Sequence, residues 1–133
     1  MARGAQWFRF MRFAAGASPT LYGRLAAREL GPADGAVVRN EGFDAFARMS
    51  SEALRQPSGA VEEYRAWVRS WGFAPEDLTV PVDVWAGTHD ELVNPSWSQR
   101  LVSRIPNATL NIREGGHFLA HLYYREIFAA LTR

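Results

Sequence analysis

Residues 80–86 read VPVDVWA, and the fold class follows from them. This stretch is short, rich in β-branched residues and mostly apolar, which is typical of a parallel strand buried on both faces. A second run of this kind, ATLNI, spans residues 108–112, and the amphipathic segment 95–105 lies between the two. Strand, helix and strand in this order predict a right-handed βαβ unit, and the pattern of residues 119–131 predicts a closing helix.

Four segments before residue 80 show a helical pattern instead. Their apolar side chains recur every three or four residues, which is typical of amphipathic helices. These segments span residues 6–15, 18–30, 42–54 and 59–71. The predicted fold class is therefore α/β. We expect a helical segment over residues 1–78, followed by strand-helix-strand-helix of a parallel sheet over residues 79–133.

The first predicted helix mixes aromatic and arginine side chains. Trp7, Phe10 and Met11 fall on one face, with Arg9 and Arg12 opposite. We expect this helix to lie against another part of the same protein. The alternative is a helix that binds a membrane surface or a partner.

The composition excludes several classes of protein. A length of 133 residues suits one domain, and 47% hydrophobic with 22% charged residues is a globular balance that excludes disorder, collagen and coiled coil. A net charge of +1 provides no field that would attract nucleic acid. The absence of cysteine excludes disulfides and thiolate sites. No apolar run approaches the roughly 18 residues that a membrane span needs, so we expect a cytoplasmic protein. The sequence predicts no cofactor.

Two ionisable residues each follow one of the predicted strands. Asp90 lies in the segment GTHDELVNP after the first strand, and His117 lies in EGGHF after the second. Because the carboxyl ends of parallel strands meet at one edge of a sheet, the two side chains can lie side by side. The carboxylate would accept the Nδ1 proton of the imidazole and fix its tautomer. The other ring nitrogen would then be free to act as a base.

On these motifs, the stretch from Val80 to Leu131 resembles the C-terminal end of the α/β-hydrolase fold family. In that family the penultimate strand ends in G-x-x-D, which carries the acid of the catalytic triad, and the last strand is followed by G-H, which carries the base. The resemblance implies that Asp90 is the triad acid and His117 the triad base. It implies hydrolysis of an ester-type or related bond in a small-molecule substrate. The helices that end near Trp71 look like the end of the helical cap found in many such hydrolases.

The sequence departs from the family pattern in its nucleophile. Family members carry it in G-x-S-x-G, on a sharp turn that precedes the acid in the chain. No serine of this chain is flanked by glycines at both positions. The nearest imitation is Gly16-Ala17-Ser18-Pro19-Thr20, and it fails because Pro19 has no backbone N–H to offer an oxyanion hole. We therefore expect that the 133-residue chain alone does not turn over activated esters.

Other interpretations remain open. The chain could be a non-catalytic interaction module, or one half of a split or truncated hydrolase whose partner chain supplies strands and nucleophile. Alternatively, the polypeptide begins upstream of Met1 and the preceding sequence contains G-x-S-x-G. In the chain as it stands, the unpaired edge of strand 80–86 could mediate self-association or bind a partner chain, because an open edge presents free N–H and C=O groups.

The remaining ionisable residues predict no further site. His117 and His121 are four residues apart, but the glutamate of H-E-x-x-H is missing and His117 is expected in a loop, so we expect no metal site. His89 is interpreted as an ordinary loop residue. Asp83 is unusual, because a carboxylate inside a doubly covered strand is costly unless it is paired. Either an arginine pairs with it, or the strand is wetter there than the pattern suggests.

Overall fold

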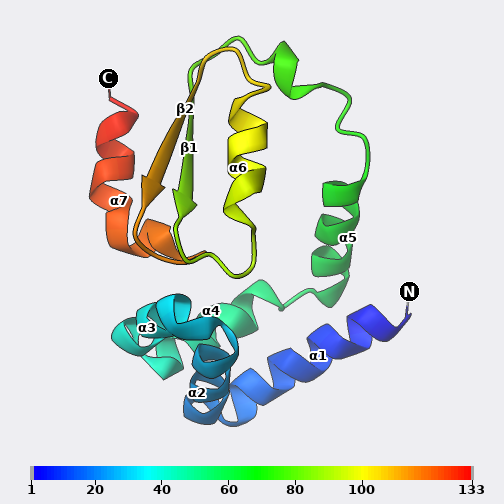
Figure 1. Cartoon of the computed structure of the whole chain (residues 1–133). Helices are drawn as coiled ribbons and strands as arrows, with labels where there is room; N and C mark the ends of the chain where they lie inside the picture. The colour runs from blue at the N-terminus through cyan, green and yellow to red at the C-terminus, as the bar shows by residue number, and fades with distance from the viewer. Residues whose placement is uncertain (1, 133) are drawn as a thin grey trace. The chain divides into compact units, whose positions relative to one another are not determined.

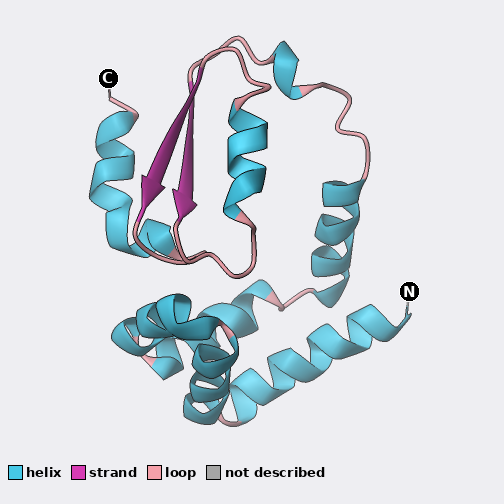
Figure 2. Cartoon of the chain, in the orientation of Figure 1, coloured by secondary structure: helices cyan, strands magenta, loops and turns pink. Residues whose placement is uncertain are grey.

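A computed structural model describes residues 2–132 of the chain. Within these residues, five α-helices are followed by strand, helix, strand and helix, which confirms the predicted α/β class (Figures 1 and 2). The elements are α1 Ala2–Ala17, α2 Pro19–Glu29, α3 Gly31–Glu41, α4 Phe43–Ala53, α5 Pro57–Val68, a 3-10 turn Pro75–Asp77, β1 Val82–Gly87, α6 Pro95–Val102, β2 Ala108–Arg113 and α7 Leu119–Ala130. None of the described helices combines the length and apolarity that a bilayer crossing requires.

Helix α3 was not predicted from the sequence. Gly31 and Pro32 end α2 as expected, but the same two residues also begin α3, where Gly31 has φ 80° and Pro32 occupies the first turn. Proline is favoured there because the amide it lacks would have no partner inside the helix. The Gly31-Pro32 pair therefore both ends α2 and begins α3.

The chain divides into two compact units, each with its own contacts. The helical unit combines the residues up to Glu29 with Val38–Gly72. The sheet unit combines Leu30–Val37 with the chain from Phe73 onward. The first part of α3 thus belongs to the sheet unit, although it is far from the strands in sequence.

The helical unit has a core of small side chains. Its fully buried residues include Ala15, Ala27 and Ala47. Gly23 lies so close to Phe43 that a Cβ added at Gly23 would be 2.5 Å from the Phe43 carbonyl oxygen. Close helix packing of this kind requires glycine or alanine at the crossing.

Helix α1 contacts α2, α4 and α5 within the helical unit, as expected for a helix that lies on the same protein. The face that packs differs from the predicted one. Phe8, Met11 and Ala15 are buried or half-buried, whereas Trp7 and Phe10 are exposed. With Phe13, which is also exposed, three aromatic rings of α1 remain in solvent.

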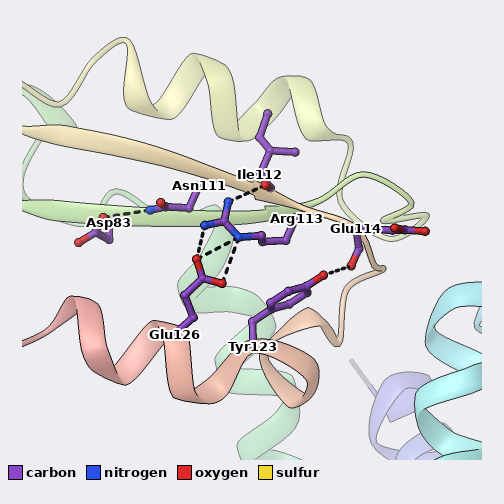
Figure 3. A network of polar contacts seen from close by, with 7 residues as sticks. All are labelled: Asp83, Asn111, Ile112, Arg113, Glu114, Tyr123 and Glu126. Atoms are coloured by element: carbon purple, nitrogen blue, oxygen red, sulfur yellow. Dashed lines mark hydrogen bonds and ion pairs between the residues drawn. The ribbon is translucent and has the colours of Figure 1, made fainter.

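The sheet unit is built on two parallel strands. They pair in register from Val82 opposite Ala108 to Gly87 opposite Arg113. Helix α6 connects them, and α6 and α7 lie on opposite faces of the strands (Figure 3).

The strands are more exposed than the sequence predicts. Burial on both faces is wrong for most of β1, in which only Ala86 and Gly87 are buried. Asp83 is exposed, and its Oδ1 accepts a hydrogen bond of 2.9 Å from Nδ2 of Asn111 on β2. β1 is therefore solvent-exposed at Asp83, and the side chain that pairs with this carboxylate is an asparagine instead of an arginine.

A polar network joins β2 to α7 on one face of the sheet (Figure 3). The guanidinium of Arg113 forms an ion pair with Glu126 and lies over the Trp85 ring, 5.2 Å from its centroid. The hydrogen bond to Glu126 raises the pKa of Arg113. The Tyr123 hydroxyl donates to the carbonyl oxygen of Glu114 at 3.1 Å. Charged and aromatic contacts, and not only apolar burial, therefore hold α7 on the sheet.

We expect the isolated chain to self-associate. In the described part, β1 pairs with β2 on one side and with no strand on the other. A two-stranded sheet is marginal in water, and an open edge pairs readily with another chain. Sedimentation velocity over a hundredfold range of concentration should show species larger than 14.9 kDa that dissociate on dilution. A clean monomer that unfolds cooperatively at every concentration would contradict this expectation.

Candidate functional site

The loops that follow β1 and β2 are tied together by their backbones. The amide of Thr88 donates to the carbonyl oxygen of Arg113 at 3.0 Å, and the amide of His89 donates to that of Gly115 at 2.8 Å. These bonds continue the pairing of the two strands past their carboxyl ends. Both predicted site residues, Asp90 and His117, follow directly on this joined segment.

Asp90 is held by the turn that leads into α6. Its Oδ1 accepts hydrogen bonds from the amides of Leu92 at 2.9 Å and Val93 at 2.8 Å. Asn94 ends this turn, and its side chain caps α6 by accepting a hydrogen bond from the Ser96 amide. Since one carboxylate oxygen is occupied by two amides, only Oδ2 is available to another partner.

The structure brings Asp90 and His117 together. Nδ1 of His117 lies 3.1 Å from Oδ2 of Asp90, across 27 residues of sequence. The Asp90 side chain is 10% exposed and the His117 side chain 43% exposed. An ionised carboxylate can only accept, so this contact fits an imidazole that donates Nδ1–H, and in the neutral ring Nε2 is then the acceptor. No described residue hydrogen-bonds to Nε2, so this nitrogen is open to a proton donor from outside.

Two glycines at this site, Gly87 and Gly116, lie where a neighbouring group approaches the backbone too closely for a side chain. A Cβ added at Gly87 would be 2.4 Å from the carbonyl oxygens of Gly115 and Gly116. A Cβ added at Gly116 would be 2.4 Å from Oδ1 of Asp34. Contacts this short are not made by real Cβ atoms, so the geometry requires glycine at Gly87 and Gly116.

Asp34 is the residue at this site that sequence reasoning missed. It lies on the part of α3 that belongs to the sheet unit and is 1% exposed. Its Oδ2 accepts from the amide of His117 at 2.9 Å, and its Oδ1 from the amide of Phe118 at 2.7 Å. A usable signal exists in the sequence: Asp34 shares a helix face with Val37 and Val38. A carboxylate on an apolar face must find a partner.

The other histidines lie outside this pair. His89 is exposed, and its Nδ1 lies 2.9 Å from the Thr88 hydroxyl. His121 packs its ring against Phe118, with 6.0 Å between centroids. His117 precedes α7, which begins at Leu119, so His117 and His121 do not share a helical turn. Across residues 2–132 no three histidine or carboxylate side chains gather in the way a metal ion needs.

Comparison with protein-family models, with curated proteins and with solved structures found no match to this chain. The function must therefore be argued from the geometry of the site and from the motifs of the sequence.

We expect Gly87→Ala to destabilise the protein. The added methyl would collide with two backbone carbonyls that cannot rotate away, and overpacking of this kind costs about 1–3 kcal/mol of unfolding free energy. Urea denaturation followed by circular dichroism measures the loss. Gly16→Ala is the matched control, because a Cβ at Gly16 meets nothing within 4 Å. The control should change stability by less than about 1 kcal/mol, in the stabilising direction. Equal midpoints for the two variants would show that the loops have room to move.

Proposed function

We propose that Asp90 and His117 are the acid and base of a hydrolase site of the α/β-hydrolase type, acting on an ester or related bond of a small-molecule substrate. The observation that carries the proposal is the contact of 3.1 Å between Oδ2 of Asp90 and Nδ1 of His117. It joins the two residues that the G-x-x-D and G-H motifs single out. From the same resemblance we propose residues 1–78 as a cap-like segment, and the cytoplasm as the location.

The roles follow from the two ring nitrogens. With Nδ1–H donated to Asp90, Nε2 can take the proton of an attacking hydroxyl and later return it to the leaving group. The carboxylate keeps the imidazole in the required tautomer and stabilises the imidazolium that forms. Asp90 is suited to this because its other oxygen is fixed by Leu92 and Val93. The exposed fraction of His117 leaves the base accessible to a substrate.

The proposal requires a nucleophile from outside this sequence. No serine or threonine hydroxyl among the described residues hydrogen-bonds to His117. A longer polypeptide or a partner chain would supply the hydroxyl, together with strands that pair with the open edge of β1.

The second candidate function is a non-catalytic interaction module. Two separate observations favour it: three aromatic rings on α1 are exposed, those of Trp7, Phe10 and Phe13, and β1 has an open edge among the described residues. In this case the Asp90–His117 contact would serve only to hold two loops together.

Labelling with a fluorophosphonate separates the two functions. We expect the purified 133-residue chain to stay unlabelled. Native material recovered from the source cells with an antibody against this chain should carry the label on a serine, in a longer polypeptide or in a co-purified partner. Recovery of a single unlabelled 14.9 kDa species would instead support the interaction module.

His117→Gln, introduced into that native protein, should slow labelling by a factor on the order of 10⁴ or more, because the nucleophile loses its base. His121→Gln is the matched control and should label at the wild-type rate. Equal rates for the two variants would remove His117 from the mechanism.

We expect Asp90→Asn to change the tautomer of His117. An amide has nearly the same shape as the carboxylate, but its NH₂ donates, so Nδ1 would become an acceptor and Nε2 would carry the proton. Long-range ¹H–¹⁵N NMR of the full chain, above the pH at which the imidazole titrates, reports both tautomers. Wild type should show Nδ1–H and the variant Nε2–H. An identical tautomer in the two proteins would mean that Asp90 does not orient the ring.

A further inference from the structure

A second carboxylate contacts His117, at its main chain. Asp34 reaches the loop from α3 and accepts hydrogen bonds from two successive amides, those of His117 and Phe118, at 2.9 and 2.7 Å. We infer that Asp34 is a positioning residue, which fixes the backbone of His117 so that the imidazole faces Asp90. The inference rests on the proposed function, because it assigns Asp34 to the same Asp90–His117 pair.

Asp34 makes two hydrogen bonds with described residues, and both are to amides of the loop after β2. Asp34 is 1% exposed, and both of its oxygens accept from these amides. No arginine forms an ion pair with it among the described residues. A buried carboxylate is costly unless hydrogen bonds compensate for the lost water. Here that compensation comes from the residue that carries the proposed base and from its neighbour.

The placement of His117 depends on such contacts because its ring is only partly packed: the Phe118 ring lies 6.0 Å away between centroids, and much of the side chain faces solvent. The side chain is 43% exposed, and its described polar contact is with Asp90. Asp90 fixes the ring at Nδ1, and Asp34 fixes the point from which the ring extends. A shift of the backbone amide would move the Nδ1–Oδ2 distance out of hydrogen-bond range even with Asp90 in place.

The loop is shaped for this carboxylate. Gly116 directly precedes His117, and a Cβ at Gly116 would be 2.4 Å from Oδ1 and 2.6 Å from Oδ2 of Asp34. Only glycine lets the backbone come close enough for the next two amides to reach both oxygens. The G-G-H motif thus contacts two elements: the end of β1 at Gly87, and α3 at Asp34.

Asp34→Asn in the full chain tests the inference. The amide keeps the size of the carboxylate but has one acceptor oxygen, and its NH₂ would face an N–H donor of the loop. Hydrogen exchange at the amides of His117 and Phe118 should become about ten- to a hundredfold faster. The Nδ1–H tautomer of His117 should lose its dominance, as seen by long-range ¹H–¹⁵N NMR. Asp83→Asn, which removes a carboxylate at the other end of β1, is the matched control and should change neither quantity.

The outcomes are distinguishable. Faster amide exchange with an unchanged tautomer would make Asp34 merely structural and overturn the inference. A wild-type protein without the Nδ1–H tautomer would overturn the proposed function, whereas the exchange of the two amides would still report on Asp34.

If Asp34→Asn fails to fold, a variant that keeps Asp34 provides the test. In the Asp90→Asn protein, the amides of His117 and Phe118 should stay protected from hydrogen exchange, because both of their acceptors on Asp34 remain. Loss of protection at both amides in that protein would show that Asp34 does not hold them in solution.

Discussion

The site depends on the close approach of the backbone at the end of β1 to the turn that follows β2. Gly87 faces the carbonyl oxygens of Gly115 and Gly116 with no room for a side chain. This approach sets the separation of the two loops, and the loops carry Asp90 and His117. A distance of 3.1 Å between two side chains is therefore a consequence of backbone packing several residues away.

Two carboxylates divide the task of holding one histidine. Asp90 contacts the ring, and Asp34 contacts the main chain of the same residue and of the next one. Each carboxylate is used at both oxygens: Asp90 by its own turn at Oδ1 and by the His117 ring at Oδ2, and Asp34 by the two loop amides. A partly exposed imidazole is in this way held by polar contacts at both its ring and its main chain.

The parts of the structure that local signals determine could be predicted from the sequence. Helices begin at Pro19 and Pro95 because proline suits a first turn, and Asp90 meets His117 because parallel strands end at one edge. Strand burial was misjudged, because it depends on neighbouring elements and not on the strand's own pattern. Asp34 was missed for the same reason, since its partners lie 83 and 84 residues away.

That separation also affects how the chain folds. Closing a loop of 83 residues costs about 1 kcal/mol more chain entropy than closing the loop of 27 residues between Asp90 and His117. The contact between Asp34 and the His117 backbone is therefore the one of higher sequence separation and higher closure cost. Contacts of such long range lower the folding rate, so the part of the site that fixes the main chain also raises the kinetic cost of reaching the folded state.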